Sequence, residues 1–366
     1  MKTKSTLFIL SLAILAACDN SITTITVSNP LDLDRTKETV SVSLEEIGVA
    51  DSESSNILIC DKNGNSIPIQ ILDGQVLFQA DVASGSESSY TVRIGEGEVS
   101  STVAYSRHVP ERMDDYAYEN NLVAGRIYGP ALETPRTFGQ DIWVKCTDKL
   151  VIDEWFKIAD YHTNRGEGMD CYKVANTLGG GAVAPYSADK IVIGDNWAEF
   201  QHLCDGPIRT AAEFTHPEFE VDGVKVQTKR SFHLDASTRF LAWTTIFEAD
   251  CDSVDVVLGA VVHDVISRED GTNYIAYTEK ASDSKDPERD GNISIGLILD
   301  SSIKAEACTM DGHAVLKFKV KTGETIRFWT GSGWSQGGVE SPQEWQNTVK
   351  NTAKCLDNPL KITIKR

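Results

Sequence analysis

The chain has 366 residues, a formal net charge of −19 at pH 7 and 41% hydrophobic residues. Such an acidic protein is not expected to bind nucleic acid, because both partners are negatively charged. The apolar fraction is sufficient for a sizeable core, and the length exceeds what one core usually supports, so two domains are expected.

The first residues have the features of an export signal. Lys2 and Lys4 give a basic start, an apolar run covers residues 7–15, and small residues precede Cys18. This pattern is typical of a bacterial lipoprotein, in which the signal peptide, here 1–17, is removed and the new terminal cysteine is acylated. The expected location is the cell envelope, with the protein anchored to the outer membrane through the lipid on Cys18 alone. The periplasmic and the surface face both remain open.

Residues 18–105 are predicted to form a small N-terminal β-sandwich. Six short segments rich in β-branched residues alternate between apolar and polar positions. Turn-forming pairs such as Asn29-Pro30 and Asp73-Gly74 separate them. Regular alternation with frequent turns indicates antiparallel strands. The segment shows no cluster of titratable groups, so a packing or docking role is expected.

Residues 106–366 are predicted to form a large antiparallel β-sandwich, which makes the fold all-β. Alternating segments recur here with turns between them, and residues 150–162 are among the predicted strands. Helical periodicity is confined to residues 341–356, where Ser341 is the expected N-cap and Pro342 the first helical residue.

Seven further cysteines follow Cys18 at wide spacings, and none forms a Cys-x-x-Cys pair. A thiolate zinc site or a redox motif is therefore not indicated. Because seven is an odd number and the spacings are wide, mostly buried free thiols are expected, and the alternative is one or two disulfides.

The first candidate binding region is residues 106–129, where charged and aromatic residues are dense. A strand near residues 122–129 places Arg126 and Tyr128 on the same face, and such a pair suits a ligand with a carboxylate. Arg112, Glu119 and Asn120 are predicted to contact the same ligand. The alternative is a salt-bridge cluster at a domain boundary.

The second candidate region is the glycine-rich segment 161–186. Its glycines preclude a regular helix, and rigidly supported loops are common places for binding and catalysis. The predicted catalytic residues are His162, Glu167, Asp170 and Tyr172, and the predicted binding residues are Tyr161 and Arg165. The alternatives are a solvated connection between strands and a divalent cation site, for example for calcium, formed by Glu167, Asp170 and His162. No other cofactor or metal is predicted.

Two further binding residues are predicted outside these segments. Trp334 lies in a Gly-Ser-Gly-Trp-Ser sequence, which favours an exposed indole that stacks on a sugar ring. Arg209, in the sequence Gly-Pro-Ile-Arg, supplies another cation.

Four segments together resemble a known bacterial family. These are RHVPERMDDYAYENNLVAGRIYGPAL, YHTNRGEGMDCYKVANTLGGG, GPIR and WTGSGW. They are similar to the family catalogued as domain of unknown function 4861, and the resemblance covers nearly the whole chain after the signal. It implies a galactose-mutarotase-like supersandwich and an association with the breakdown of uronate-containing polysaccharides by Bacteroides-type bacteria. It does not imply a particular reaction.

Three functions follow as hypotheses, all with a carbohydrate as the ligand. The favoured one is β-elimination on a uronate sugar, in which an arginine neutralises the carboxylate and His162 removes the neighbouring proton. Arg126, Arg165 or Arg209 would be that arginine, and Tyr172 or Tyr161 would return a proton to the leaving oxygen.

The other two hypotheses use the same pocket differently. The second is mutarotase-like or hydrolytic chemistry, with His162 or His263 acting together with Glu167 or Asp170. The third is a lipoprotein that binds sugar without turning it over.

Overall fold

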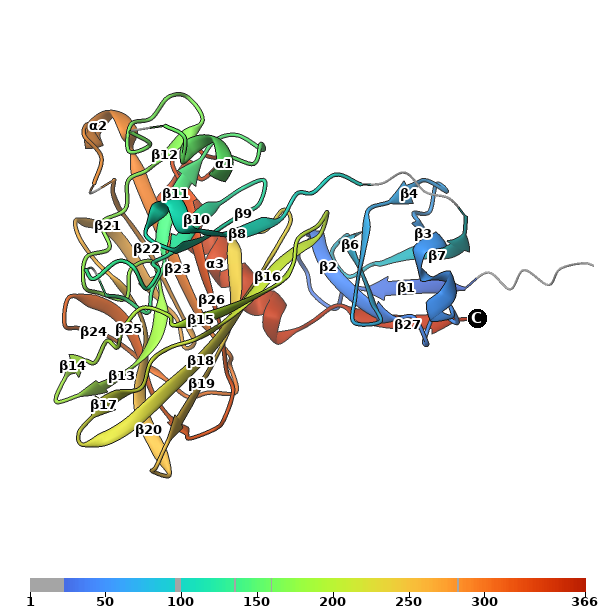
Figure 1. Ribbon diagram of the computed structural model, residues 1–366. Coiled ribbons are helices and arrows are strands. Elements are labelled where there is room, and N and C mark those ends of the chain that lie inside the picture. Colours follow the sequence, from blue (N-terminus) through green and yellow to red (C-terminus); the bar gives the residue numbers. More distant parts are fainter. Residues whose placement is uncertain (1–22, 96–99, 135, 159, 282) are drawn as a thin grey trace, which may run out of the picture.

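The computed structural model describes residues 23–95, 100–134, 136–158, 160–281 and 283–366. Cys18 and the predicted signal peptide lie outside the described residues. Within the described ranges, no helix is long and apolar enough to cross a membrane. Figure 1 shows a small unit, built from the first strands of the chain, beside a much larger β-rich unit.

The small unit consists of two facing sheets in the part of the chain that the structure describes. The first has the strand order β27 (Lys361–Lys365), β1 (Thr24–Ser28), β7 (Glu87–Ile94), β3 (Ile57–Cys60), β4 (Ser66–Ile67). The second has the order β2 (Arg35–Ser43), β6 (Gln75–Val82), β5 (Ile69–Leu72), and a short 3-10 helix, η1 (Asp51–Asn56), precedes β3. Apolar side chains of both sheets, such as Ile25 of β1 and Phe78 of β6, form its core.

The six predicted segments of this unit all contain strands. The fourth is divided into β4 and β5 at Pro68, which has no N–H to donate to a ladder. The last strand of the unit comes from the far end of the chain. β27 pairs antiparallel with β1, from Thr24 opposite Lys365 to Ser28 opposite Lys361. The sequence prediction had assigned these residues to the large unit.

The large unit contains two sheets that pack face to face. The main sheet has the order β15 (Glu199–Cys204), β16 (Arg209–Thr215), β18 (Val224–Asp235), β19 (Phe240–Ala249), β26 (Ile326–Trp334), β23 (Asn292–Leu299), β22 (Tyr274–Lys280), β21 (Val265–Asp270), with β17 (Phe219–Val221) paired to β18. The second sheet has the order β14 (Lys190–Ile191), β13 (Ala182–Ser187), β20 (Ser253–Val261), β25 (His313–Lys321), β24 (Glu306–Met310). Alternate residues of both sheets meet in one large core. The predicted all-β sandwich is confirmed.

A further sheet, which we call the site sheet, covers one end of the sandwich (Figure 1). Its order is β12 (Gly168–Asp170), β11 (Asp141–Lys145), β10 (Ala124–Ile127), β9 (Asp115–Glu119), β8 (Tyr105–Val109). A short 3-10 helix, η2 (Pro110–Arg112), links β8 to β9. The helices α1 (Ile152–Trp155) and α2 (Pro287–Asp290) lie at the same end in Figure 1.

The strand predicted over residues 150–162 is wrong, because α1 begins within it. The carboxylate of Glu119 accepts hydrogen bonds from the N–H groups of Val151, at 2.6 Å, and Ile152, at 2.8 Å. These N–H groups are the free donors at the start of a helix, and an acidic group stabilises them there. Trp155 then stacks on Trp143, with ring centroids 5.6 Å apart. Contacts distant in sequence therefore decide the local structure.

The predicted C-terminal helix is confirmed as α3 (Pro342–Asp357). The Ser341 hydroxyl caps it by accepting the N–H of Glu344 at 3.2 Å. Trp345 anchors the helix on the main sheet, since its ring stacks on Phe240 and its indole N–H donates to the carbonyl of Ile295.

The seven cysteines in the described ranges are free thiols, as expected, but most of them are not buried. Cys60 and Cys171 are buried, whereas Cys146 is exposed.

Candidate functional site

The centre of the site is Arg126, which is buried on β10 among acidic side chains. Its Nε lies 2.8 Å from Asp141 Oδ2, and its two Nη atoms lie 3.1 Å from Asp115 Oδ2 and 3.1 Å from Asp170 Oδ2. The strand pairing explains this arrangement. Arg126 sits directly opposite Asp141 in the β10–β11 ladder, and β9 and β12 bring Asp115 and Asp170 from either side.

Burial changes the protonation of this cluster. Removal from water raises the pKa of Asp115 from 3.8 to about 6, although the guanidinium of Arg126 opposes the shift. Burial also raises the pKa of Asp141, and burial together with the nearby Asp141 charge holds the pKa of Asp170 well above its usual value. Because one guanidinium cannot balance these carboxylates, the cluster retains protons that exposed aspartates lose.

Two tyrosines complete the shell around Arg126. The Tyr128 hydroxyl donates to Asp141 at 3.1 Å, and its ring lies under the guanidinium with its centroid 4.9 Å from Cζ. Arg126 Nη1 also donates to the Tyr161 hydroxyl at 3.0 Å. The donors of Arg126 are therefore used by the protein itself. This corrects the expectation that Arg126 and Tyr128 bind a ligand carboxylate.

His162 lies where the cluster meets solvent, and its side chain is 36% exposed. Its Nδ1 is 3.1 Å from the backbone carbonyl of Asp170 and 3.6 Å from the Asp170 carboxylate. The imidazole stacks on the Tyr161 ring at 4.7 Å. The backbone holds the two residues in place, since the N–H of Asp170 donates to the carbonyl of Tyr161 at 3.0 Å.

This geometry suits an imidazole that acts as a base. The carbonyl oxygen of Asp170 that faces Nδ1 fixes the orientation of the ring and leaves the other nitrogen for a reacting group. In the described parts of the chain, no hydrogen bond is seen to Nε2 of His162.

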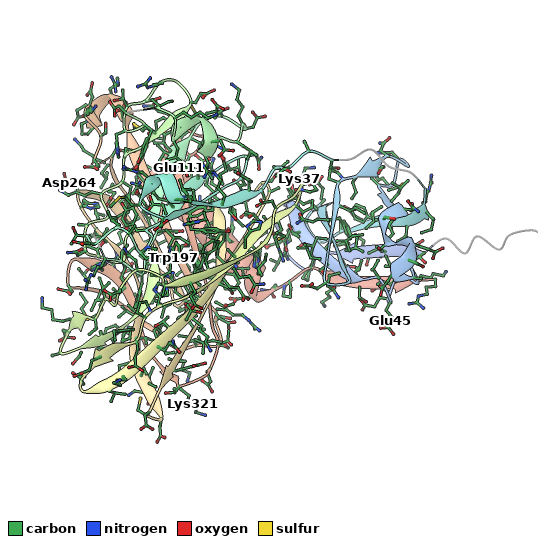
Figure 2. The ribbon with its side chains drawn as sticks, viewed as in Figure 1. Lys37, Glu45, Glu111, Trp197, Asp264 and Lys321 are labelled. Atoms are coloured by element: carbon green, nitrogen blue, oxygen red, sulfur yellow. The ribbon has the colours of Figure 1, made fainter. Side chains whose placement is uncertain are left out.

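Arg112 places a positive charge beside the ring of Tyr161. Its Cζ is 5.6 Å from the centroid of the Tyr161 ring, and the side chain is partly exposed. Within the described ranges, Arg112 forms no ion pair. By contrast, the nearby Arg107 binds both Asp153 and Glu111, and Figure 2 labels Glu111 beside the site sheet. Arg112 is therefore available to an anionic ligand.

Comparison with known proteins identifies the family. The model of the family described as "Domain of unknown function (DUF4861)" matches residues 27–362. The chain belongs to this family. A curated relative, "Uncharacterized protein P7" of Formosa agariphila, is 27% identical, and the match covers 98% of each chain.

Solved structures show that other proteins share the fold of this DUF4861 member. An α-mannosidase from Enterococcus faecalis matches 94% of the chain with a TM-score of 0.57 and 8% identity. A protein in the glycosyl hydrolase family 38, also from Enterococcus faecalis, matches 94% with a TM-score of 0.56 and 9% identity. The matches cover 46% and 47% of those two chains. The chain thus spans less than half of their length, and at this identity the likeness concerns the fold alone.

Three predicted residues of the glycine-rich segment do not join His162 in the DUF4861 structure. Glu167 points outward in an ion pair with Lys149, 2.8 Å apart. Arg165 is exposed and donates to the backbone carbonyl of Asp160 at 3.3 Å. Tyr172 is buried in the large core, where its hydroxyl donates to a backbone carbonyl of β20 at 3.0 Å. Because Glu167 points away, it does not join Asp170 and His162 in the predicted calcium site. The described residues contain no group of three potential metal ligands.

Three other residues that were predicted to bind the ligand form contacts within the protein instead. Glu119 caps α1 and pairs with the buried Lys145 at 3.1 Å. Asn120 is buried and donates to the backbone carbonyls of Asp235, the last residue of β18, and Thr238, in the β18–β19 connection. Trp334 was expected to be exposed but is 1% exposed, and its indole N–H donates to the carbonyl of Asp290 at 2.7 Å.

Arg209 lies away from the site sheet, in the groove between the two units. It forms two hydrogen bonds to the Asp235 carboxylate, of 2.6 and 2.8 Å.

Sequence reasoning did not select Asp115 or Asp141 for the site. The available signal was Asp141 itself, an acid at the start of the otherwise buried β11 segment Asp-Ile-Trp-Val-Lys. An acid in a buried strand requires a partner, and the partner is Arg126.

Proposed function

We propose that this protein acts on carbohydrates that carry carboxylate groups, with His162 as the base, and that the reaction is β-elimination. One observation carries the proposal. A partly exposed imidazole, oriented by the buried Asp170, stacks on the same tyrosine that Arg112 contacts, and Arg112 has no ion pair with any residue that the structure describes.

Elimination from a uronate requires three groups. A cation on the carboxylate makes the proton on C5 more acidic, a base removes that proton, and an acid protonates the oxygen that leaves C4. Arg112 would bind the carboxylate, and His162 Nε2 would take the proton. The electron pair of the C5–H bond then forms the C4=C5 double bond while the C4–O bond breaks.

Tyr161 is the candidate acid for the leaving oxygen. Its hydroxyl accepts a hydrogen bond from Arg126, and its own proton has no acceptor among the residues described. Burial raises the pKa of Tyr161, so its hydroxyl stays protonated until the leaving oxygen becomes a strong base.

The comparisons support carbohydrate as the substrate class. Two proteins of similar fold are an α-mannosidase and a protein in the glycosyl hydrolase family 38. Because the chain spans less than half of those proteins, the elimination proposal rests on the site and not on their reactions.

A panel of acidic and neutral oligosaccharides tests the proposal. With a uronate substrate, we expect a rise in ultraviolet absorbance from the conjugated C4=C5 product. New reducing ends without this absorbance would indicate hydrolysis, and faster anomeric equilibration without a change of mass would indicate mutarotation. Either result would contradict elimination.

The role of His162 is tested with His162→Ala. Loss of a base typically costs about 10²- to 10⁴-fold in rate. We expect such a loss with unchanged thermal unfolding, and partial recovery on addition of free imidazole. An unaltered rate would remove His162 from the mechanism.

We also propose that acylated Cys18 anchors the protein to the outer membrane. The basic and apolar residues before Cys18 support this proposal. A Cys18→Ala variant should lose labelling by radioactive fatty acid and leave the membrane fraction. Equal labelling of both forms would contradict it.

A further inference from the structure

A groove runs between the small unit and the outer face of the main sheet. Two cavities of about 760 Å³ each lie along it. Both are lined by Arg209, His233, Ala242 and Trp329 of the main sheet and by Thr39 of the small unit. Because they share these walls, the cavities form one continuous groove. Lys37, which also lines it, lies where the two units meet in Figure 2.

The floor of the groove is a row of residues across adjacent strands. In the strand register, His233 of β18 faces Ala242 of β19, and Ala242 faces Trp329 of β26. Neighbouring positions such as Phe232 point the other way and are buried in the core. The small side chain of Ala242 leaves space between the imidazole and the indole. Trp329 is therefore a partly exposed aromatic surface on a rigid sheet.

The small unit is held firmly against this floor. The amide of Gln70 accepts the N–H groups of Ile208, at 3.1 Å, and Arg209, at 2.8 Å, and donates to the carbonyl of Arg209 at 3.0 Å. A side chain at Gly206 would not fit, since a Cβ there would lie 2.5 Å from the Gln70 amide. The Gly-Pro-Ile-Arg sequence thus serves the contact between the units, and the groove is preformed.

The polar groups of the groove suit a sugar chain. Burial lowers the pKa of His233 to about 4, so its imidazole is neutral at pH 7 and both donates and accepts hydrogen bonds. Ser231 and Thr244 add hydroxyls on the floor. Arg327 is exposed in the groove and, within the described parts of the chain, forms no ion pair. An aromatic face with polar groups at its edge matches the apolar face and hydroxyl rim of a pyranose ring.

We infer that this groove binds an extended acidic glycan, with one sugar ring stacked on Trp329 and a carboxylate near Arg327. The inference rests on the proposed carbohydrate function. It assigns binding of the sugar chain to a surface on the main sheet, apart from the site that contains His162. Two joined cavities suit several sugar units better than a single one.

Affinity electrophoresis in gels that contain acidic polysaccharides tests the inference. We expect at least one polysaccharide to slow the wild-type protein, and Trp329→Ala to weaken this binding by tenfold or more. Phe200→Ala is the matched control, because Phe200 is an exposed aromatic on β15 that does not line the groove. His162→Ala should bind as tightly as the wild type.

The outcomes separate the groove from the catalytic proposal. Binding that depends on Trp329 but is accompanied by no turnover would support the groove and overturn the proposed reaction. Equal turnover of polymers by Trp329→Ala and the wild type would contradict glycan binding in the groove but would agree with the proposed reaction. Failure of every polysaccharide to slow the wild-type protein would also overturn the groove.

Discussion

Arg126 and Arg230 are both buried in the large unit, yet their surroundings are opposite. Arg126 contacts three carboxylates, and their charges keep its pKa well above the usual value. Arg230, on β18, donates to the carbonyl of Phe138 and stacks on Trp243 at 4.6 Å, but its Nε and Nη2 have no partner among the described residues. Burial alone lowers the pKa of Arg230 to about 9.

Arg126 holds its acidic neighbours through ion pairs, whereas Arg230 is buried without an ion pair among the described residues. Removal of Arg126 would leave acidic groups buried without a counter-charge. Removal of Arg230 would leave no such group, because no ion pair to it exists in the described parts of the chain. The cost of a buried charge depends on its partners more than on its depth.

The largest predicted effect is that of Arg126→Met. The substitution leaves Asp115, Asp141 and Asp170 buried without a positively charged partner. Removing one partner of a buried ion pair typically costs about 3–5 kcal/mol. We expect a loss of this size in the free energy of unfolding measured with urea at pH 7. A loss below about 1 kcal/mol would show that the cluster is not held by Arg126.

The pH dependence of stability gives a somewhat smaller effect. Because the pKa of Asp115 rises from 3.8 to about 6 on folding, the folded protein binds this proton more tightly than the unfolded chain does. The resulting stabilisation is complete below pH 3.8 and is lost as pH rises to about 6. It amounts to at most roughly 3 kcal/mol, at 1.36 kcal/mol per pKa unit.

Asp115→Asn isolates this contribution. Urea unfolding of the variant and the wild type at pH 4.5 and pH 7.5 should show a smaller decrease of stability with pH in the variant. Parallel pH profiles for the two proteins would contradict the raised pKa of Asp115.

The smallest predicted effect is that of Arg230→Met. An apolar side chain of similar length keeps the packing on Trp243 and removes the cost of an uncompensated charge, so stability should stay within about 1 kcal/mol or increase. The same urea experiment checks this. A loss as large as that of Arg126→Met would mean that Arg230 has a partner of equal importance.

Much of the fold could be predicted from the alternation of apolar and polar residues. The strands of the small unit and the capped helix α3 follow from local sequence. The pairing of β27 with β1 does not, because 333 positions separate Ser28 from its partner Lys361 in the chain and no local pattern specifies that contact. The helix α1 was also missed, since its start depends on Glu119 of a distant strand.

The candidate site was predictable in part. His162, Tyr161, Asp170 and Arg112 were all selected from the sequence, and the structure brings them together. The roles of the arginines were not predictable, because they depend on which carboxylates the strand register places beside each one. Trp334 shows a related limit. Adjacent glycines suggested exposure, but they allow close packing of the backbone as well.

The most direct test of the account is the rate of elimination from a uronate oligosaccharide by Arg112→Gln. Loss of one hydrogen bond to a charged group costs about 1.5–3 kcal/mol, so we predict a decrease in kcat/KM of roughly 10- to 100-fold. The matched control is Arg136→Gln, since Arg136 is exposed and pairs with Asp195 away from the site. We predict an unchanged rate for this control. Equal rates for wild type, Arg112→Gln and Arg136→Gln would contradict the account.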